Sequence, residues 1–357
     1  MSMEDRILVS RFLLRASRSY AWSCLKNCVK ILIGRKSYFD DRDLFFRQYV
    51  FHLTGFRSIR KITSPGLRGE GPGSQALMIM SAINFARASG LKYVHTPLKS
   101  ILHADRPMQE WAAAWETCFN LGEGEAICDV ERHEVVNYAY NFPELELCFG
   151  WHGRTEQLTK HFKNLLPEFR RKYYLDKSPH ATGEVSVAVH VRRGDVTADR
   201  ASHLFTPTKA ILQTINAARS ILNTHAINHG IGIYSEGNGR DFEDLAVPGV
   251  ELVKYRIGNF ADDDDNAGSA SASLTGVPGI DPIEAMRALI EADVLIMAKS
   301  SFSYYAALIC DGIRIYDSHF RPPMDDWLPI APGGSFDTAV FEQQLLALIQ
   351  AKANRTP

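Results

Sequence analysis

The segment that most constrains this chain is an apolar run, residues 185–191 (VSVAVHV), which ends directly in a polar cluster, residues 192–195 (RRGD). Valine and alanine fill most of the run, which is typical of a strand buried on both faces of a parallel sheet. In open α/β sheets, ligands bind outside the carboxyl ends of the strands. The cluster therefore has the position of a binding site.

The two arginines of this cluster favour an anionic ligand. Arginine side chains cannot be buried without anionic partners, and Asp195 can neutralise one of the two. The other is then suited to a ligand anion, most simply a phosphate held by two parallel hydrogen bonds. Because side chains alternate along a strand, His190 and Arg192 share one face. A purely structural Arg–Asp pair at a strand end is the alternative.

Strand and helix patterns alternate through the second half of the chain. Strands are expected at 230–235, 250–255, 293–298 and 313–316, and helices at 206–224, 281–291, 302–310 and 341–353. This alternation predicts an α/β fold with a parallel sheet and helices on both faces. A loop, a helix and a strand over 67–96 predict a second unit of the same class, so we expect two α/β domains that face a cleft.

The length of 357 residues also favours two domains. We expect a basic helical segment over 1–60 packed on the first domain, the first α/β domain over 61–180, the second over 181–345, and a helix end with a tail over 346–357. Within the first part we expect a helix over 44–63, an irregular acidic segment over 123–143 and a helix over 155–174.

Composition excludes several classes of function. The net charge is −1, so no global field attracts nucleic acid. The six cysteines complete no zinc motif and are expected to be free thiols of a reducing compartment, the cytoplasm. No apolar run reaches the roughly 20 residues that span a bilayer. The basic N-terminus either packs on the first domain or lies on the inner face of a membrane.

Three strand ends of the second domain carry polar clusters, which a parallel sheet would bring to one edge. They are the arginine cluster, Ser235 with Glu236, and the serines Ser300, Ser301 and Ser303. The serines lead into a helix, whose free N–H groups and dipole attract phosphate. Serine is also a common helix N-cap, which is the structural alternative. A glycine-rich loop over 69–75 either admits a ligand to the backbone or closes a turn.

Residues 190–195 (HVRRGD) resemble the H-x-R-R-x-D motif of the GDP-fucose-dependent fucosyltransferases of the α1,2, α1,6 and protein-O-fucosylating kinds. Three further segments resemble motifs of this family in the same order: residues 69–75 (GEGPGSQ), 233–237 (IYSEG) and 300–305 (SSFSYY). Ser74 departs from the residue pair usual in the first of these. Together the four segments span about residues 67–316.

The resemblance implies a GT-B fold of two Rossmann-like domains and an inverting, metal-independent transfer of fucose to a glycan or glycolipid hydroxyl. GDP-fucose would be held mainly by the second domain, with no cofactor. Arg192 would bind the donor β-phosphate, and Asp195 is assigned with it to the catalytic group. The implied donor-binding residues are His190, Arg193, Ser235, Glu236, Ser300, Ser301 and Ser303. The implied acceptor-side loop residues are Glu70, Gly71, Gly73 and Gln75.

Several alternatives stay open. Direct displacement requires a base for the acceptor hydroxyl, and Asp195, Asp199 and Glu70 are candidates. The donor could be another nucleotide sugar, or the chain could bind nucleotide sugars or glycans without transfer. The acidic run 262–265 (DDDD) is either a solvated loop, which we favour, or the metal-binding motif of the other large glycosyltransferase fold.

Overall fold

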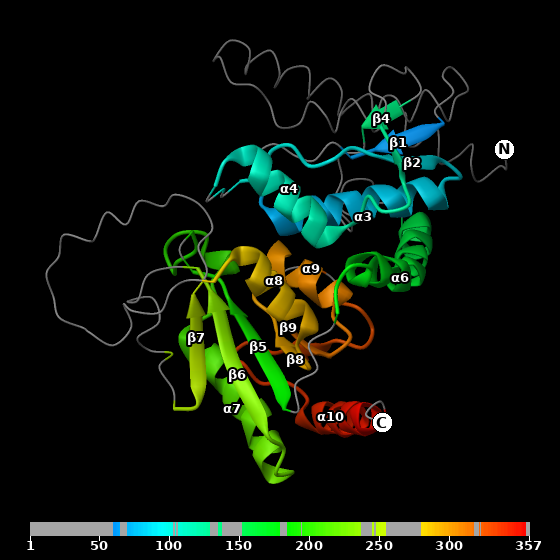
Figure 1. Cartoon of the computed structure of the whole chain (residues 1–357). Helices are drawn as coiled ribbons and strands as arrows, with labels where there is room; N and C mark the ends of the chain where they lie inside the picture. Colours follow the sequence, from blue (N-terminus) through cyan, green and yellow to red (C-terminus); the bar gives the residue numbers. More distant parts are fainter. Residues whose placement is uncertain are drawn as a thin grey trace, which may run out of the picture.

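The computed structural model describes residues 60–64, 70–102, 104, 106–128, 135–137, 152–178, 184–193, 195–236, 245, 248–254, 280–317, 321 and 323–354. These residues form two parallel sheets with helices packed on them (Figure 1). The expected α/β class is therefore confirmed. The basic N-terminal segment, Gly69, Gly194 and the acidic run 262–265 lie outside the described residues.

The first unit has a sheet of four short strands: β1 (Lys61–Thr63), β2 (Lys92–His95), β3 (Ala126–Ile127) and β4 (Val135–Asn137). Their order is β3-β2-β1-β4, and every pair is parallel. The helices described in this unit are α3 (Pro72–Ala88), α4 (Met108–Phe119) and α6 (His152–Tyr174).

Two expectations for this unit are wrong. Residues 61–63 form a strand rather than the end of a helix, and the segment 123–143 contains β3 and β4. Ile62 is fully buried and pairs with strands on both sides, so pairing with distant segments overrides the local helical pattern. Strands of two or three residues are too short to show a period of two.

The second unit has a sheet of six strands: β5 (Val185–Val191), β6 (His229–Ser235), β7 (Val250–Lys254), β8 (Val294–Ile296), β9 (Ile313–Asp317) and β10 (Leu328–Ile330). Their order is β10-β9-β8-β5-β6-β7, all parallel. Numbered along the chain, this is the strand order 3-2-1-4-5-6 of a Rossmann domain. The sequence did not predict β10, a short edge strand that contains Pro329.

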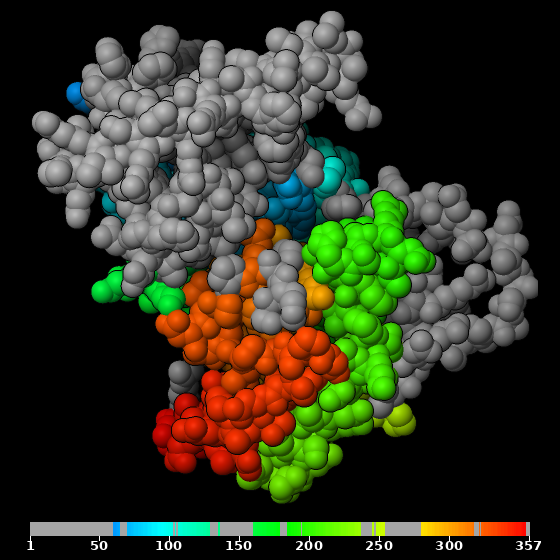
Figure 2. Space-filling model, turned by 180° about the vertical axis from the view of Figure 1, so that it is seen from behind, coloured from blue at the N-terminus to red at the C-terminus, as the bar shows by residue number. Residues whose placement is uncertain are grey.

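Four helices cover this sheet: α7 (Thr208–Thr224), α8 (Pro282–Glu291), α9 (Ser301–Ile309) and α10 (Thr338–Ala353). The valines of β5 share a buried cluster with residues of α7 and α10, whereas Ala188 points into the cluster of α8 and α9. Figure 2, seen from behind, shows α7 in green and α10 in red as the outer layer. The α8 and α9 face is turned toward the first unit (Figure 1).

The two units share one continuous core. A single buried cluster includes Ile62 of β1, Trp115 of α4 and Tyr305 of α9. Helix α3 lies directly on α9, and a Cβ atom added to Gly73 would lie 2.6 Å from the Ser301 carbonyl oxygen. Arg106, before α4, forms an ion pair of 2.5 Å with Asp281, which caps α8. These contacts fix the first unit against one face of the second sheet.

No helix in the described part of the chain is both long enough and apolar enough to cross a membrane. Cys118, Cys128 and Cys310, the cysteines that the structure describes, carry free thiols as expected.

Candidate functional site

The predicted site residues lie around the carboxyl ends of the second sheet, at the end that faces α4 (Figure 1). The chain leaves β5 toward α7 on one face and leaves β8 toward α9 on the other. Open α/β sheets commonly bind ligands at such a switch between neighbouring strands. The polar groups that follow β5 and β8 lie at this switch point.

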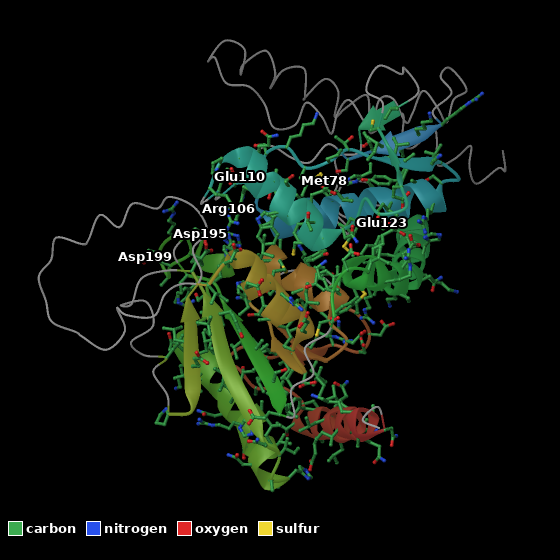
Figure 3. The ribbon with its side chains drawn as sticks, in the orientation of Figure 1. Met78, Arg106, Glu110, Glu123, Asp195 and Asp199 are labelled. Atoms are coloured by element: carbon green, nitrogen blue, oxygen red, sulfur yellow. The ribbon has the colours of Figure 1, made fainter. Side chains whose placement is uncertain are left out.

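Arg192 and Asp195 form a bidentate ion pair at the end of β5. Arg192 Nε donates to Asp195 Oδ1 at 3.1 Å, and Nη2 donates to Oδ2 at 2.6 Å. The side chains are 24% and 22% exposed, so the pair is in contact with solvent. Asp195 and Asp199 lie below Arg106 and Glu110 of the first unit in Figure 3. The carboxylate thus orients the guanidinium at the end of β5.

His190 lies two residues before Arg192, so the two side chains share one face of the strand. It is buried, and its ring centroid lies 5.5 Å from that of Phe302 in α9. Burial first, and then the nearby Arg192 charge, lower the pKa of His190 to about 3. The imidazole is therefore neutral at physiological pH, and Arg192 provides the positive charge on this face.

Arg193 points to the opposite face and organises the loop that follows β5. Its guanidinium donates to the carbonyl oxygens of Arg192 and Thr206, each at 2.9 Å, and lies 4.3 Å from the ring centroid of Phe205. The side chain is buried. These contacts tie the far end of the loop to the strand end.

Ser235 and Glu236 end the neighbouring strand β6. The buried Ser235 hydroxyl donates to the Val191 carbonyl at 2.5 Å, which joins the ends of β5 and β6. Burial, and then repulsion from Asp195, raise the pKa of Glu236 to about 8, against an opposing effect of Arg192. Arg192, Asp195 and Glu236 thus form one cluster, in which Glu236 keeps its proton at neutral pH.

The three serines differ in what their hydroxyls contact. Ser300 is the N-cap of α9 and accepts from the Phe302 N–H at 3.1 Å. Ser303 is buried and donates to the Ala298 carbonyl at 3.1 Å. Ser301, half-buried, accepts from Arg321 Nη2 at 3.3 Å. Arg321 follows β9, so the fold adds to the start of α9 a cation that the sequence did not predict.

The acceptor-side loop lies where α3 begins and meets α9. Gly71 is the N-cap of α3, and Gly73 packs on Ser301 and Phe302. The buried Gln75 amide donates to the carbonyls of Glu70 at 3.1 Å and Ser100 at 2.7 Å. The fold therefore brings the first and last sequence motifs into contact, although more than 200 residues separate them.

The three candidate bases are not equivalent. Asp195 pairs with Arg192, and Glu70 is half-buried beside the start of α3. Asp199 is exposed, on a turn in which the Thr197 N–H donates to the Arg200 carbonyl at 2.9 Å. The fold places Asp195 in the polar cluster and leaves Asp199 on the outer surface of the loop.

A cavity of about 290 Å³ opens beside this cluster, and sequence reasoning missed most of its residues. It is lined by the ends of β5 and β8, the first turns of α7 and the turn that follows β10. Lys299 and Asp317, which line it, form an ion pair of 3.5 Å. Each follows or ends an apolar strand, which is the signal that could have identified it.

The described residues contain no group of three or more His, Cys, Asp or Glu side chains that could hold a metal ion.

No protein-family model and no curated protein matches the chain. Among solved structures, it is similar to E. coli heptosyltransferase WaaC with ADP-2-deoxy-2-fluoro heptose, at 13% identity and a TM-score of 0.36, over 84% of this chain and 100% of that one. The same enzyme with ADP gives 12% identity and a TM-score of 0.36, over 83% and 99%. This level of likeness carries no argument, so the interpretation depends on the residues described above.

Proposed function

We propose that this protein is an inverting glycosyltransferase, which moves a sugar from a nucleoside diphosphate to a hydroxyl group of a glycan or glycolipid. The observation that carries the proposal is Arg192, oriented by Asp195 at the switch point of a sheet with Rossmann strand order. The serine-capped start of α9 and Arg321 border the same edge. Such a set of donors and positive charge suits a diphosphate.

The finer proposal is that the donor is GDP-fucose and that no metal is required. Its support is the resemblance of HVRRGD and the three accompanying segments to the fucosyltransferase motifs. In this proposal Arg192 takes the role that a divalent cation has in metal-dependent transferases, because it neutralises charge on the diphosphate. Another nucleotide sugar is the alternative donor.

The chemistry follows from where charge develops. When the bond between the sugar and the diphosphate breaks, negative charge accumulates on the leaving diphosphate. A cation and N–H groups that are already fixed in place stabilise this charge more in the transition state than in the bound donor. Asp195 orients Arg192, and Arg193 holds the loop that carries Asp195. A carboxylate must also accept the proton of the acceptor hydroxyl, and Asp195, Asp199 and Glu70 remain the candidates.

The proposal can be tested by measuring release of nucleoside diphosphate from a panel of GDP-fucose, GDP-mannose and UDP-glucose, with a chelator present. Slow hydrolysis of a donor in the absence of acceptor is sufficient to detect turnover. If GDP-fucose is the one donor of the panel from which nucleoside diphosphate is released, the full proposal is supported. Release from a different donor would retain the transferase and reject fucose, whereas release that depends on added metal would reject the role of Arg192.

One observation favours a second candidate, a protein that binds nucleotide sugars without transferring them. Asp195 is engaged by Arg192, and Asp199 is on the outer face of its turn. Neither arrangement presents an obvious base to an acceptor. Tight donor binding with no turnover, with or without a range of glycan acceptors, would identify this case.

A further inference from the structure

An exposed apolar patch of the first unit lies outside the proposed donor site. Leu102 and Met108 are 44% and 40% exposed, although both are large apolar side chains. They lie close together, because the Ile101 N–H donates to the Met108 sulfur at 3.3 Å. Pro107, directly before Met108, is also exposed. We call Leu102, Pro107 and Met108 the apolar lip. Apolar side chains that gather on a surface, unlike single scattered ones, favour an interaction site.

The backbone of the apolar lip is held at both ends. The Leu102 N–H donates to the Glu70 carbonyl at 3.0 Å, which ties the start of the lip to the loop before α3. Met108 is the first residue of α4, and the Trp111 N–H closes the first turn of this helix by donating to the Pro107 carbonyl at 2.9 Å. A surface that is already fixed loses little conformational entropy when a ligand binds to it.

The apolar lip lies at the end of the first unit that is turned toward the donor site. Its Leu102 is bonded to Glu70, a residue of the acceptor-side loop. Arg106, from the same segment, forms the ion pair of 2.5 Å with Asp281 of the second unit. In Figure 3, Arg106 lies above Asp195, which marks the end of β5. A group bound on the lip would therefore belong to the acceptor rather than to the donor.

The chemistry of the apolar lip does not suit a sugar ring. A sugar presents hydroxyl groups, which need hydrogen-bonding partners when they leave water. Leucine, proline and methionine side chains make no strong hydrogen bond. An alkyl chain, in contrast, gains free energy when it leaves water on such a surface, and a flexible methionine adapts to its shape. The group that the lip recognises is therefore an apolar part of the acceptor.

The size of the apolar lip distinguishes an alkyl chain from a protein partner. A stable protein–protein interface buries about 800 Å² on each partner, from 20 to 30 residues. The lip consists of three side chains, of which Leu102 and Met108 are each less than half exposed. This surface is too small for a protein interface and is sufficient for one chain.

We propose that the apolar lip binds the alkyl chain of the acceptor, so that the acceptor is a glycolipid. The inference rests on the proposed function, because it names the class of acceptor that the same site takes. It adds Leu102, Pro107 and Met108 to the acceptor side, and all three lie outside the four sequence motifs.

The test is a titration of the whole protein, labelled with ¹³C in its methionine methyl groups, with octyl β-glucoside below its critical micelle concentration. Methyl β-glucoside, which carries the same sugar without the chain, is the matched ligand. Octyl β-glucoside should shift the Met108 methyl resonance, assigned by its loss in Met108→Leu, and methyl β-glucoside should not. Leu102→Ser should weaken the binding of octyl β-glucoside about fivefold, because one apolar contact is lost.

Leu175→Ser is the matched protein control, because Leu175 is 48% exposed directly after α6 and lies outside the lip. It should bind octyl β-glucoside as the wild type does. Equal shifts by the two glucosides, or equal affinities of Leu102→Ser and the wild type, would overturn the assignment of the lip.

Release of nucleoside diphosphate from the donor panel, measured on the same protein, tests the proposed function separately. Donor turnover without binding of the chain would retain the transferase and reject the glycolipid. Binding of the chain without turnover of any donor would reject the transferase and, with it, the role of the lip in acceptor binding.

Discussion

The two units use polar residues at their strand ends in opposite ways. In the first unit these side chains bond mainly to one another. Thr63 and Thr96 are 2.7 Å apart through their hydroxyls, and His95 contacts Tyr93 at 3.1 Å and Glu116 at 2.7 Å. All but Glu116 are buried. These groups hold the short strands of the first sheet together.

At the corresponding end of the second sheet several polar groups carry a charge and are only partly buried. Arg192, Lys299 and Arg321 follow three different strands and are each only partly buried. Partly buried cations gathered at strand ends favour a site for an anion, whereas polar side chains that bond mainly to one another favour a structural role. We therefore propose that donor binding belongs to the second unit, whereas these pairs of the first unit hold its sheet together.

The largest expected effect is that of Arg192→Ala on transfer. Loss of this cation should lower kcat/KM for the donor about 10³-fold, because the diphosphate charge is left without its fixed partner. Thermal unfolding should change little, since the side chain is partly exposed. Arg219→Ala is the control in the same unit, a half-buried arginine of α7 that donates to the Pro248 carbonyl. Equal turnover by the two variants would contradict the proposed role of Arg192 in transfer.

The next effect tests the contact that joins the units. Gly73→Ala places a methyl group 2.6 Å from the Ser301 carbonyl and 2.7 Å from Phe302 Cα, both backbone atoms. Overpacking of this kind should lower the free energy of unfolding by about 2–3 kcal/mol, measured by denaturant titration.

Gly230→Ala is the matched control for that junction. In β6 the nearest atom to an added Cβ is Glu184 Oε2 at 3.8 Å, so the substitution should be neutral or slightly stabilising. If Gly73→Ala were as stable as Gly230→Ala, α3 and α9 would not be packed as described.

A pH-dependent effect should separate the two units further. Glu236 holds its proton up to about pH 8 in the folded protein, against an ordinary value of 4.5. Between these values the folded state binds more protons than the unfolded state, so stability falls as the pH rises. Glu236→Gln removes this dependence. The wild type should therefore lose stability relative to the variant by up to about 1.4 kcal/mol per pH unit between pH 6.5 and 8.

Thermal unfolding of both proteins across that range measures the difference. His190, whose pKa is lowered to about 3, gives an opposite dependence below its ordinary value, but it is present in both proteins and cancels. A stability difference that does not change with pH would show that Glu236 is ionised throughout.

The smallest effect belongs to the first unit. Thr63→Val removes the hydroxyl that pairs with Thr96 and should cost about 1 kcal/mol of stability. Nucleotide affinity should stay within about twofold of the wild type, because the pair is internal to the first sheet. Weakened nucleotide binding would mean that the strand ends of the first unit take part in the site.

The second unit could be predicted from the sequence because its patterns are long and local. β5 is seven buried residues, and α7, α8 and α9 begin and end close to their expected limits. In the first sheet only β2 was predicted, since β1, β3 and β4 are two or three residues long and depend on pairing with distant segments. Arg192 and the serines were identifiable from motifs. Arg321 reaches Ser301 through the packing of β9 beside β8, which no local pattern encodes.

The central claim is that the second unit binds a guanine nucleotide through Arg192 without a metal. The most direct measurement is calorimetric titration of the whole protein with GDP, GDP-fucose, GDP-mannose and UDP, with a chelator present. We expect that GDP and GDP-fucose bind and that UDP binds at least about tenfold more weakly than GDP. Absence of guanine-nucleotide binding, or a preference for UDP, would contradict it.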